Sequence, residues 1–171
     1  KGVFVLLEAC KILKKKEILF HCTFVGGEGD ISGEQLTQSI KKADLLDEVC
    51  YAGRKYGADK SEVFSEADIF AFPTFYSNET FGLVLLEAMQ FSVPVVSTFE
   101  GGIPDVVADG ETGFLVPQKE VEALVDKLET LIKDPVLRKE MGILGRKKYE
   151  SEFTLSTFER RFTTTLKNII K

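Results

Sequence analysis

The sequence predicts an α/β fold with three layers, in which helices cover both faces of a mostly parallel sheet. Short apolar segments alternate with amphipathic segments of helical period along the whole chain. Two of the apolar segments run into paired glycines, Gly26-Gly27 and Gly101-Gly102. Residues 68–102 contain a strand, a loop, a helix, a strand and a glycine turn in succession. This succession places a helix N-terminus at the carboxyl edge of a parallel sheet, where phosphorylated ligands bind in open α/β folds.

Length and composition indicate one globular domain that spans residues 1–171. The net charge of −5 argues against nucleic acid as a partner, and no apolar run approaches the roughly 20 residues that cross a bilayer. Cys10, Cys22 and Cys50 are widely spaced, so we expect reduced core thiols in a cytoplasmic protein. The sequence shows no signal peptide. Because it begins at Lys1 without a methionine, we expect it to be part of a longer protein.

The first part of the chain is expected to alternate helices and strands. The expected helices are 2–16, 31–46 and 59–66, and the expected strands are 18–25 and 48–53. The strand 18–25 is almost continuously apolar, which is typical of a strand covered on both faces. His21, the only histidine, has no evident catalytic or metal-binding partner, so we expect a structural role. Ala58 or Asp59 is expected to cap the third helix.

The central unit begins with a strand at 68–72 and continues with a helix that starts near Thr80 or Phe81. This helix is apolar nearly all round, so it should be mostly buried. Glu79 then lies in the loop before the helix, and Glu87 lies roughly 9 Å further along the helix axis. A carboxylate on a buried helix needs a charged partner or a polar ligand.

The remaining part of the chain is expected to form two strands and four helices. The strands are 94–97 and 114–116, and the helices are a short one opened by 101–104, then 121–132, 135–150 and 155–169. Asp134 and Pro135 are typical of the start of a helix. The last helix carries an apolar stripe beside basic side chains. We expect it to pack on the domain, and the alternative is a helix at a membrane surface.

Glu79 and Glu87 are too far apart to form a stacked pair, but they suit an elongated ligand with hydroxyl groups in two places. Gly82 lies between them and lets a ligand approach the backbone closely. The first N–H groups of the helix have no helical partners and can bind phosphate. Together these groups suit a nucleotide sugar, with the sugar at one end, the ribose at the other and the diphosphate near the amides.

The sequence around the two glutamates resembles a known family. Glu-x-Phe-Gly-Leu-x-x-x-Glu-Ala-Met at 79–89, Pro-Val-Val at 94–96, Gly-Gly at 101–102 and Asp-Gly-x-x-Gly-Phe-Leu-Val at 109–116 are similar to the donor-binding domain of family 4 retaining glycosyltransferases. The resemblance covers nearly the whole chain. It implies the C-terminal half of a GT-B enzyme, in which two Rossmann-like domains face each other across a cleft. It also implies one more strand ahead of Lys1.

The resemblance assigns roles to the residues of the central unit. It implies that Glu79 orients the donor sugar in the catalytic site and that Glu87 contacts the ribose. It also implies that the backbone of Phe81, Gly82 and Leu83 faces the sugar and the phosphates. The alternative for Glu79 is a surface glutamate in a loop. The alternative for Glu87 is a structural glutamate paired with a lysine.

The family's other donor contacts fall on Lys1, on Gly26-Gly27 and on Gly53-Arg54-Lys55. In the family, the lysine binds the diphosphate, the first loop borders the nucleotide and the second loop lies against the base. The alternatives are a mobile terminal lysine, a plain turn and a solvated basic pair. The family usually has glycine where this chain has Ser92.

The resemblance implies a retaining transfer of a sugar from a nucleotide diphosphate sugar to an acceptor hydroxyl in glycan synthesis. There is no Asp-x-Asp motif, so neither a metal ion nor a cofactor is implied beyond the donor. The implied partner is a missing N-terminal domain, which carries most of the acceptor site. Any association with the cytoplasmic face of a membrane would occur through that domain. The alternatives are a nucleotide-sugar-binding subunit, a sugar-nucleotide epimerase of the GT-B fold, and a regulatory module without a ligand.

Overall fold

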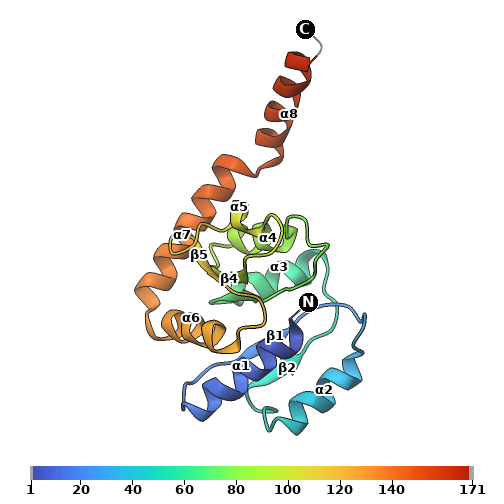
Figure 1. Ribbon diagram of the computed structural model, residues 1–171, viewed down its shortest axis with the longest axis vertical. Helices are drawn as coiled ribbons and strands as arrows, with labels where there is room; N and C mark the ends of the chain where they lie inside the picture. The colour runs from blue at the N-terminus through green and yellow to red at the C-terminus, as the bar shows by residue number, and fades with distance from the viewer. Residues whose placement is uncertain (1, 170–171) are drawn as a thin grey trace.

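The computed structural model describes residues 2–169 and shows helices and parallel strands in alternation (Figure 1). The helices are α1 (Val3–Lys15), α2 (Gly33–Lys42), α3 (Gly57–Glu66), α4 (Leu83–Gln90), α5 (Ile103–Val106), α6 (Val121–Lys133), α7 (Pro135–Glu152) and α8 (Leu155–Ile169). The strands are β1 (Cys22–Phe24), β2 (Val49–Tyr51), β3 (Phe70–Phe72), β4 (Val95–Thr98) and β5 (Gly113–Val116). The predicted α/β class is confirmed. Lys1, a predicted phosphate ligand, lies outside the described residues.

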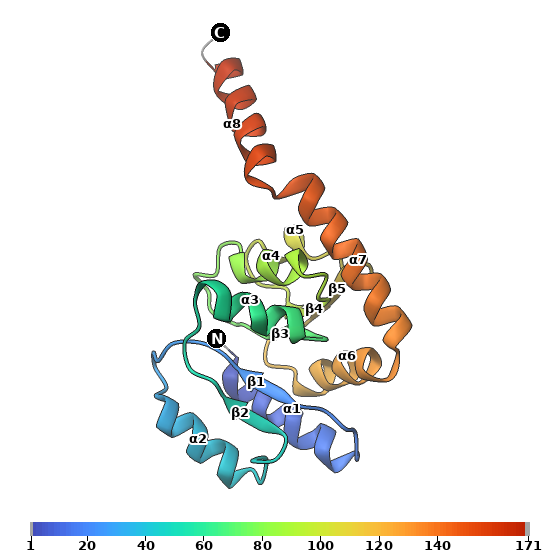
Figure 2. The same ribbon diagram turned by 180° about the vertical axis from the view of Figure 1, so that it is seen from behind.

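The strands form two parallel sheets. β1 pairs with β2, and β4 lies between β3 and β5. Figure 2 shows the strands following one another in the order β2, β1, β3, β4 and β5. The predicted parallel pairing is therefore confirmed, but the hydrogen bonding is interrupted between β1 and β3. This interruption divides what we expected to be one sheet.

Residues 18–25 form a shorter and more exposed strand than predicted. Only Cys22–Phe24 pair with β2, and Leu19 is 92% exposed. The prediction that this strand is covered on both faces is wrong. The face that carries His21, Thr23 and Cys50 is open to solvent in the part of the chain described.

Two hydrophobic cores lie on opposite faces of β4. Val96 belongs to the core under α1, α2 and α6, whereas Val95 belongs to the core formed with α3, α4 and α5. Successive side chains of a strand point to opposite faces, so the sheet is the middle layer of three. On the first face α1 packs against α6, and on the second α4 packs against α7. The predicted three-layer architecture is present.

A cluster of ion pairs joins α1 to α6 at the surface. Lys16 Nζ lies 2.6 Å from one carboxylate oxygen of Glu129, and Lys133 Nζ lies 2.5 Å from the other. Hydrogen bonds from Lys133 and then from Lys16 lower the pKa of Glu129 from its ordinary value of 4.5. The ionised carboxylate therefore stabilises the fold above that value, and its contribution is lost as the pH falls through the lowered pKa.

Of the two helix caps predicted from the sequence, the cap of α7 is present and that of α3 is not. Asp134 Oδ1 accepts hydrogen bonds from two backbone N–H groups in the first turn of α7, as predicted. The cap predicted at Ala58 or Asp59 is wrong. α3 already begins at Gly57, so Tyr56 takes the cap position, where its side chain makes no cap hydrogen bond.

The last helix, α8, extends away from the body of the domain (Figures 1 and 2). Its apolar stripe is open to solvent, since Leu155, Phe158, Phe162 and Leu166 are 42–72% exposed. The prediction that this stripe packs on the domain is wrong, because only Thr157 in the first turn of α8 is buried. Within residues 2–169, no helix combines the length and the apolar character that crossing a bilayer requires.

Candidate functional site

The loop that carries Glu79 is fastened to the turn after β4. Gly102 N donates a hydrogen bond to Thr80 O at 2.9 Å. The backbone of Gly101 lies so close to the loop that an added Cβ would sit 1.9 Å from Glu79 O. Glu79 is half-buried. These contacts hold the backbone of Glu79 at the edge where β3 and β4 end, which is the edge at which the sequence predicts a ligand.

Two hydroxyl groups bind the end of β3 to β4 at the same edge. Ser97 Oγ donates to Phe72 O at 2.7 Å, and Thr98 Oγ1 donates to Thr74 O at 2.5 Å. Ser97, Thr98 and Thr74 are all buried. Because these hydroxyls reach carbonyl groups at and beyond the end of β3, they fix the start of the loop that leads to Glu79.

The N-terminus of α4 is exposed and follows a glycine in the left-handed region. Gly82 has φ +68°, and Leu83 is 70% exposed. α4 starts at Leu83 and not near Thr80 or Phe81, because the left-handed Gly82 interrupts the helical backbone. The centre of the Phe81 ring lies 5.8 Å from the centre of the Phe153 ring, so this side chain packs on the domain. The exposed start of α4 is where the sequence predicts the diphosphate-binding amides.

Glu87 forms an ion pair with Lys60. Its Oε2 lies 2.5 Å from Lys60 Nζ, and the two side chains are 40% and 35% exposed. The prediction that this helix is mostly buried is confirmed, because Leu85, Ala88 and Met89 lie in the core and only the two ends of α4 are exposed. The pair with a lysine is the one that the alternative for Glu87 predicted. No sequence motif marks Lys60, and only the contact between α3 and α4 reveals it.

The loops after β1 and β2 touch each other. Gly26 N donates to Gly53 O at 2.9 Å, and Tyr51 Oη donates to Gly26 O at 2.9 Å. A Cβ added to Gly27 would lie 2.1 Å from Arg54 Nη2, so the absence of a side chain there makes room for the guanidinium. The structure thus brings together four residues of the predicted donor site, namely Gly26, Gly27, Gly53 and Arg54.

The loop 53–56 leads directly into α3. Arg54 is exposed, and its Cζ lies 6.0 Å from the centre of the Tyr56 ring, which is 68% exposed. Lys55, between them, is half-buried. A guanidinium and an aromatic ring on one exposed loop suit contacts with a base or a phosphate.

The three cysteines are free thiols, and only Cys10 occupies the buried core position that was predicted for them. Cys22 is half-buried, and a hydrogen bond with Cys10 lowers its pKa. The same hydrogen bond and burial raise the pKa of Cys10. Cys50 is exposed, and its Sγ lies 3.6 Å from His21 Nε2 on the open face of β1 and β2. Within residues 2–169, no three His, Cys, Asp or Glu side chains gather as a metal site.

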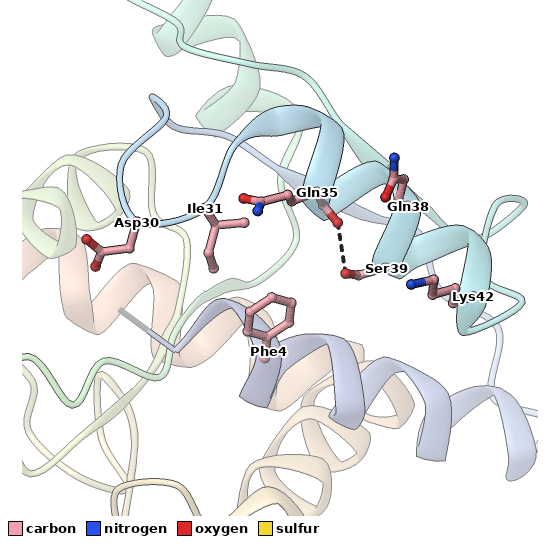
Figure 3. A pocket seen from close by; sticks show the side chains of 7 residues that line it. All are labelled: Phe4, Asp30, Ile31, Gln35, Gln38, Ser39 and Lys42. Carbon is pink, nitrogen blue, oxygen red and sulfur yellow. Dashed lines mark hydrogen bonds between the residues drawn. The ribbon is translucent and has the colours of Figure 1, made fainter.

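A hollow of about 350 Å³ lies between α1 and α2, apart from the predicted donor residues (Figure 3). The ring of Phe4 in α1 points toward α2, which supplies Gln35 and Ser39. Two polar side chains that line the hollow are hydrogen-bonded within α2 and to the residue that caps it. Ser39 Oγ donates to Gln35 O at 2.8 Å, and Gln35 Oε1 accepts from Ser32 N at 2.9 Å. None of the predicted donor residues lines this hollow.

The comparison with known families agrees with this arrangement. The model of the family described as glycosyl transferases group 1 matches residues 1–148. The chain belongs to this family. The matched range includes both glutamates and the loops after β1 and β2. Relatives of the chain include proteins named as glycosyltransferases.

Individual relatives show which part of a longer protein this chain matches. The capsular polysaccharide biosynthesis glycosyltransferase CapM of Staphylococcus aureus is 32% identical over 90% of this chain, which covers 39% of CapM. Anabaena Alr3699/HepE, solved in complex with UDP, is 26% identical with a TM-score of 0.85, and the match covers 98% of this chain and 45% of that one. The chain therefore spans less than half the length of these relatives and corresponds to the C-terminal half of GT-B glycosyltransferases.

A third relative was solved as a domain of similar size. The crystal structure of the C-terminal domain of LpcC, a group 1 family protein from Francisella tularensis, is 27% identical with a TM-score of 0.75. The match covers 91% of this chain and 80% of that domain. A C-terminal domain of this family can therefore be crystallised by itself.

Proposed function

We propose that this chain is the donor-binding half of a retaining glycosyltransferase that needs no metal ion. The enzyme would transfer a sugar from a nucleotide diphosphate sugar to an acceptor hydroxyl in glycan synthesis. The observation that carries the proposal is the exposed N-terminus of α4, which lies between Glu79 and Glu87 in the sequence and follows the left-handed Gly82. The solved complex of HepE with UDP supports a nucleoside diphosphate as part of the ligand.

The proposed reaction exchanges one bond of the anomeric carbon for another. The bond to the diphosphate oxygen breaks, and the acceptor oxygen forms its bond on the same face of the sugar. The proton of the acceptor hydroxyl passes to the leaving phosphate, so no side chain of this chain acts as the base. The α4 N-terminus at Leu83 stabilises the negative charge that develops on the diphosphate.

The side chains of the site position the donor. Glu79 accepts hydrogen bonds from hydroxyls of the sugar, and Glu87 accepts them from the ribose. Arg54 and Lys55 lie on the loop proposed to contact the base or the phosphates. Carboxylates suit this task because each oxygen can accept from more than one hydroxyl.

We also propose that residues 1–171 act as one domain beside an N-terminal acceptor domain, because the chain covers 39% of CapM and 45% of HepE. Any contact with a membrane would then belong to that other domain. Three free thiols support a reducing compartment such as the cytoplasm.

The test is a calorimetric titration of UDP, GDP and ADP into the 171-residue chain. We expect one of them to bind. Glu87→Ala should weaken the binding of that nucleotide by about 1.5–3 kcal/mol, because a hydrogen bond to a charged group is lost. Glu79→Ala should leave the affinity for the free nucleotide nearly unchanged. The same variant should bind the corresponding nucleotide sugar more weakly, because only the sugar contacts Glu79.

Glu159→Ala, on the exposed helix α8, is the matched control and should bind like the wild type. If none of the three nucleotides binds a folded wild-type chain, the proposed function is wrong. Equal binding by the wild type and Glu87→Ala would remove Glu87 from the site.

A further inference from the structure

Lys60, in α3, is the ion-pair partner of Glu87. Its Nζ lies 2.5 Å from Oε2, one of the two oxygens of the Glu87 carboxylate. The Glu87 side chain is 40% exposed, so part of it is open to solvent. The pair joins two neighbouring helices, α3 and α4, and it is the one ion pair of Glu87 among residues 2–169.

Lys60 also lies one turn after the loop proposed to contact the base. Its backbone N–H bonds to the carbonyl oxygen of Tyr56 at 3.4 Å, in the first turn of α3. Tyr56 in turn lies beside the guanidinium of Arg54. One lysine therefore connects the end of the loop 53–56 with the carboxylate on α4.

We propose that Lys60 is a positioning residue that fixes the Glu87 carboxylate for the ribose hydroxyls. This inference rests on the proposed function. The ammonium group beside Oε2 restricts rotation of the carboxylate, and the acceptor sites that it does not occupy can accept from a ribose hydroxyl. By the same contact, Lys60 sets the separation between the loop 53–56 and the ribose contact on α4.

The exposure of the pair decides where its effect should be seen. Exposed ion pairs contribute little to the free energy of unfolding, because water screens them and ordering long side chains costs entropy. A loss of Lys60 should therefore change ligand discrimination much more than thermal stability. This difference separates a positioning role from a merely structural one.

The experiment compares each nucleotide with its 2′,3′-dideoxy analogue, which lacks both ribose hydroxyls. UDP, GDP and ADP and their analogues are titrated into the 171-residue chain and into Lys60→Met, Lys60→Arg and Glu87→Gln. For the nucleotide that binds, Lys60→Met should lower the affinity by about fivefold or more, as expected for a weakened hydrogen bond to a charged group. The affinity for the dideoxy analogue should change little, so the preference for the ribonucleotide becomes smaller.

Lys60→Arg should restore most of that preference, since its guanidinium can also hold the carboxylate. Glu87→Gln should remove most of the preference, and adding Lys60→Met to Glu87→Gln should then have little further effect. Lys41→Met, an exposed lysine on α2, is the matched control and should behave like the wild type. Melting temperatures measured for all variants should stay close to that of the wild type.

Three results would overturn the inference. An unchanged preference in Lys60→Met would do so and would leave the proposed function intact. An equal loss for the ribonucleotide and its analogue would assign Lys60 a general structural effect. Tighter binding by Lys60→Met would show that the lysine competes with the ribose for Glu87. Failure of the wild type to bind any of the three nucleotides would instead remove the proposed function itself.

Discussion

Gly101 has no room for a side chain, and this restriction controls the loop that carries Glu79. The residue has φ +51°, and a Cβ there would lie 1.9 Å from Glu79 O. A backbone oxygen cannot move aside as the end of a flexible side chain can. A larger residue at position 101 would therefore displace the loop 79–80 from the turn after β4.

We predict that Gly101→Ala lowers the free energy of unfolding by about 3 kcal/mol or more, because strain and a backbone clash combine. The matched control is Gly110→Ala, which has φ +80° but nothing within 4 Å of its added Cβ. That variant should lose only about 1–2 kcal/mol, from the left-handed backbone alone. Urea unfolding measures both losses, and equal losses would mean that the contact with Glu79 does not matter.

Ser92 shows how the structure explains a departure from the family pattern. It has φ +58°, a left-handed conformation that glycine adopts without strain. The resemblance implies glycine at this position for that reason. Serine keeps the turn between α4 and β4 in the same conformation, at some cost in stability.

At the scale of elements, α7 supports α4 and therefore the helix that carries Leu83 and Glu87. α7 meets α4 and the turn after it at two of its glycines. A Cβ on Gly142 would lie 1.9 Å from Ser92 O, whereas a Cβ on Gly145 would have Met89 Cγ as its nearest neighbour at 3.4 Å. The first contact is with backbone and the second with a flexible side chain, so the two glycines differ in what they tolerate.

We predict opposite effects for alanine at these two positions. Gly145→Ala should be neutral or stabilise by up to about 1 kcal/mol, because alanine favours the helix. Gly142→Ala should destabilise by about 2 kcal/mol or more, because α7 must shift away from Ser92. Chemical unfolding of both variants tests this, and a stable Gly142→Ala would mean that α7 can move without cost.

At the scale of the whole molecule, α8 contributes little to the core. It extends away from the domain, and its apolar residues from Phe158 onward are exposed (Figure 1). An apolar stripe of this kind is typical of a surface that another domain or chain covers. In the proposed two-domain enzyme, the stripe would be available to the rest of the protein.

We predict that removing residues 159–171 leaves the melting temperature within about 3 °C of the original, because residues 159–169 bury no core side chain. Circular dichroism during heating measures this. Removing residues 135–171 is the contrasting variant and should unfold the chain, since it also removes α7, which packs on α4. A large loss from the shorter deletion would show that α8 packs on the domain in solution.

The sequence predicted much of the fold because local patterns carry it. Apolar periodicity located the helices, and glycines marked the turns at the edge of the sheet. The predictions overestimated the burial of residues 18–25 and of α8, because apolar character does not say whether a partner element is present. Nor did the sequence predict the contact between Cys50 and His21.

The sequence by itself determined the α/β class, the family and the two acidic positions, since these depend on residue types at fixed spacing along the chain. Only the tertiary structure decided that Lys60 pairs with Glu87, that Gly101 holds the backbone of Glu79, and that hydrogen bonding is interrupted between β1 and β3. These features join segments distant in the chain, and how closely such segments approach depends on the packing of whole helices and strands.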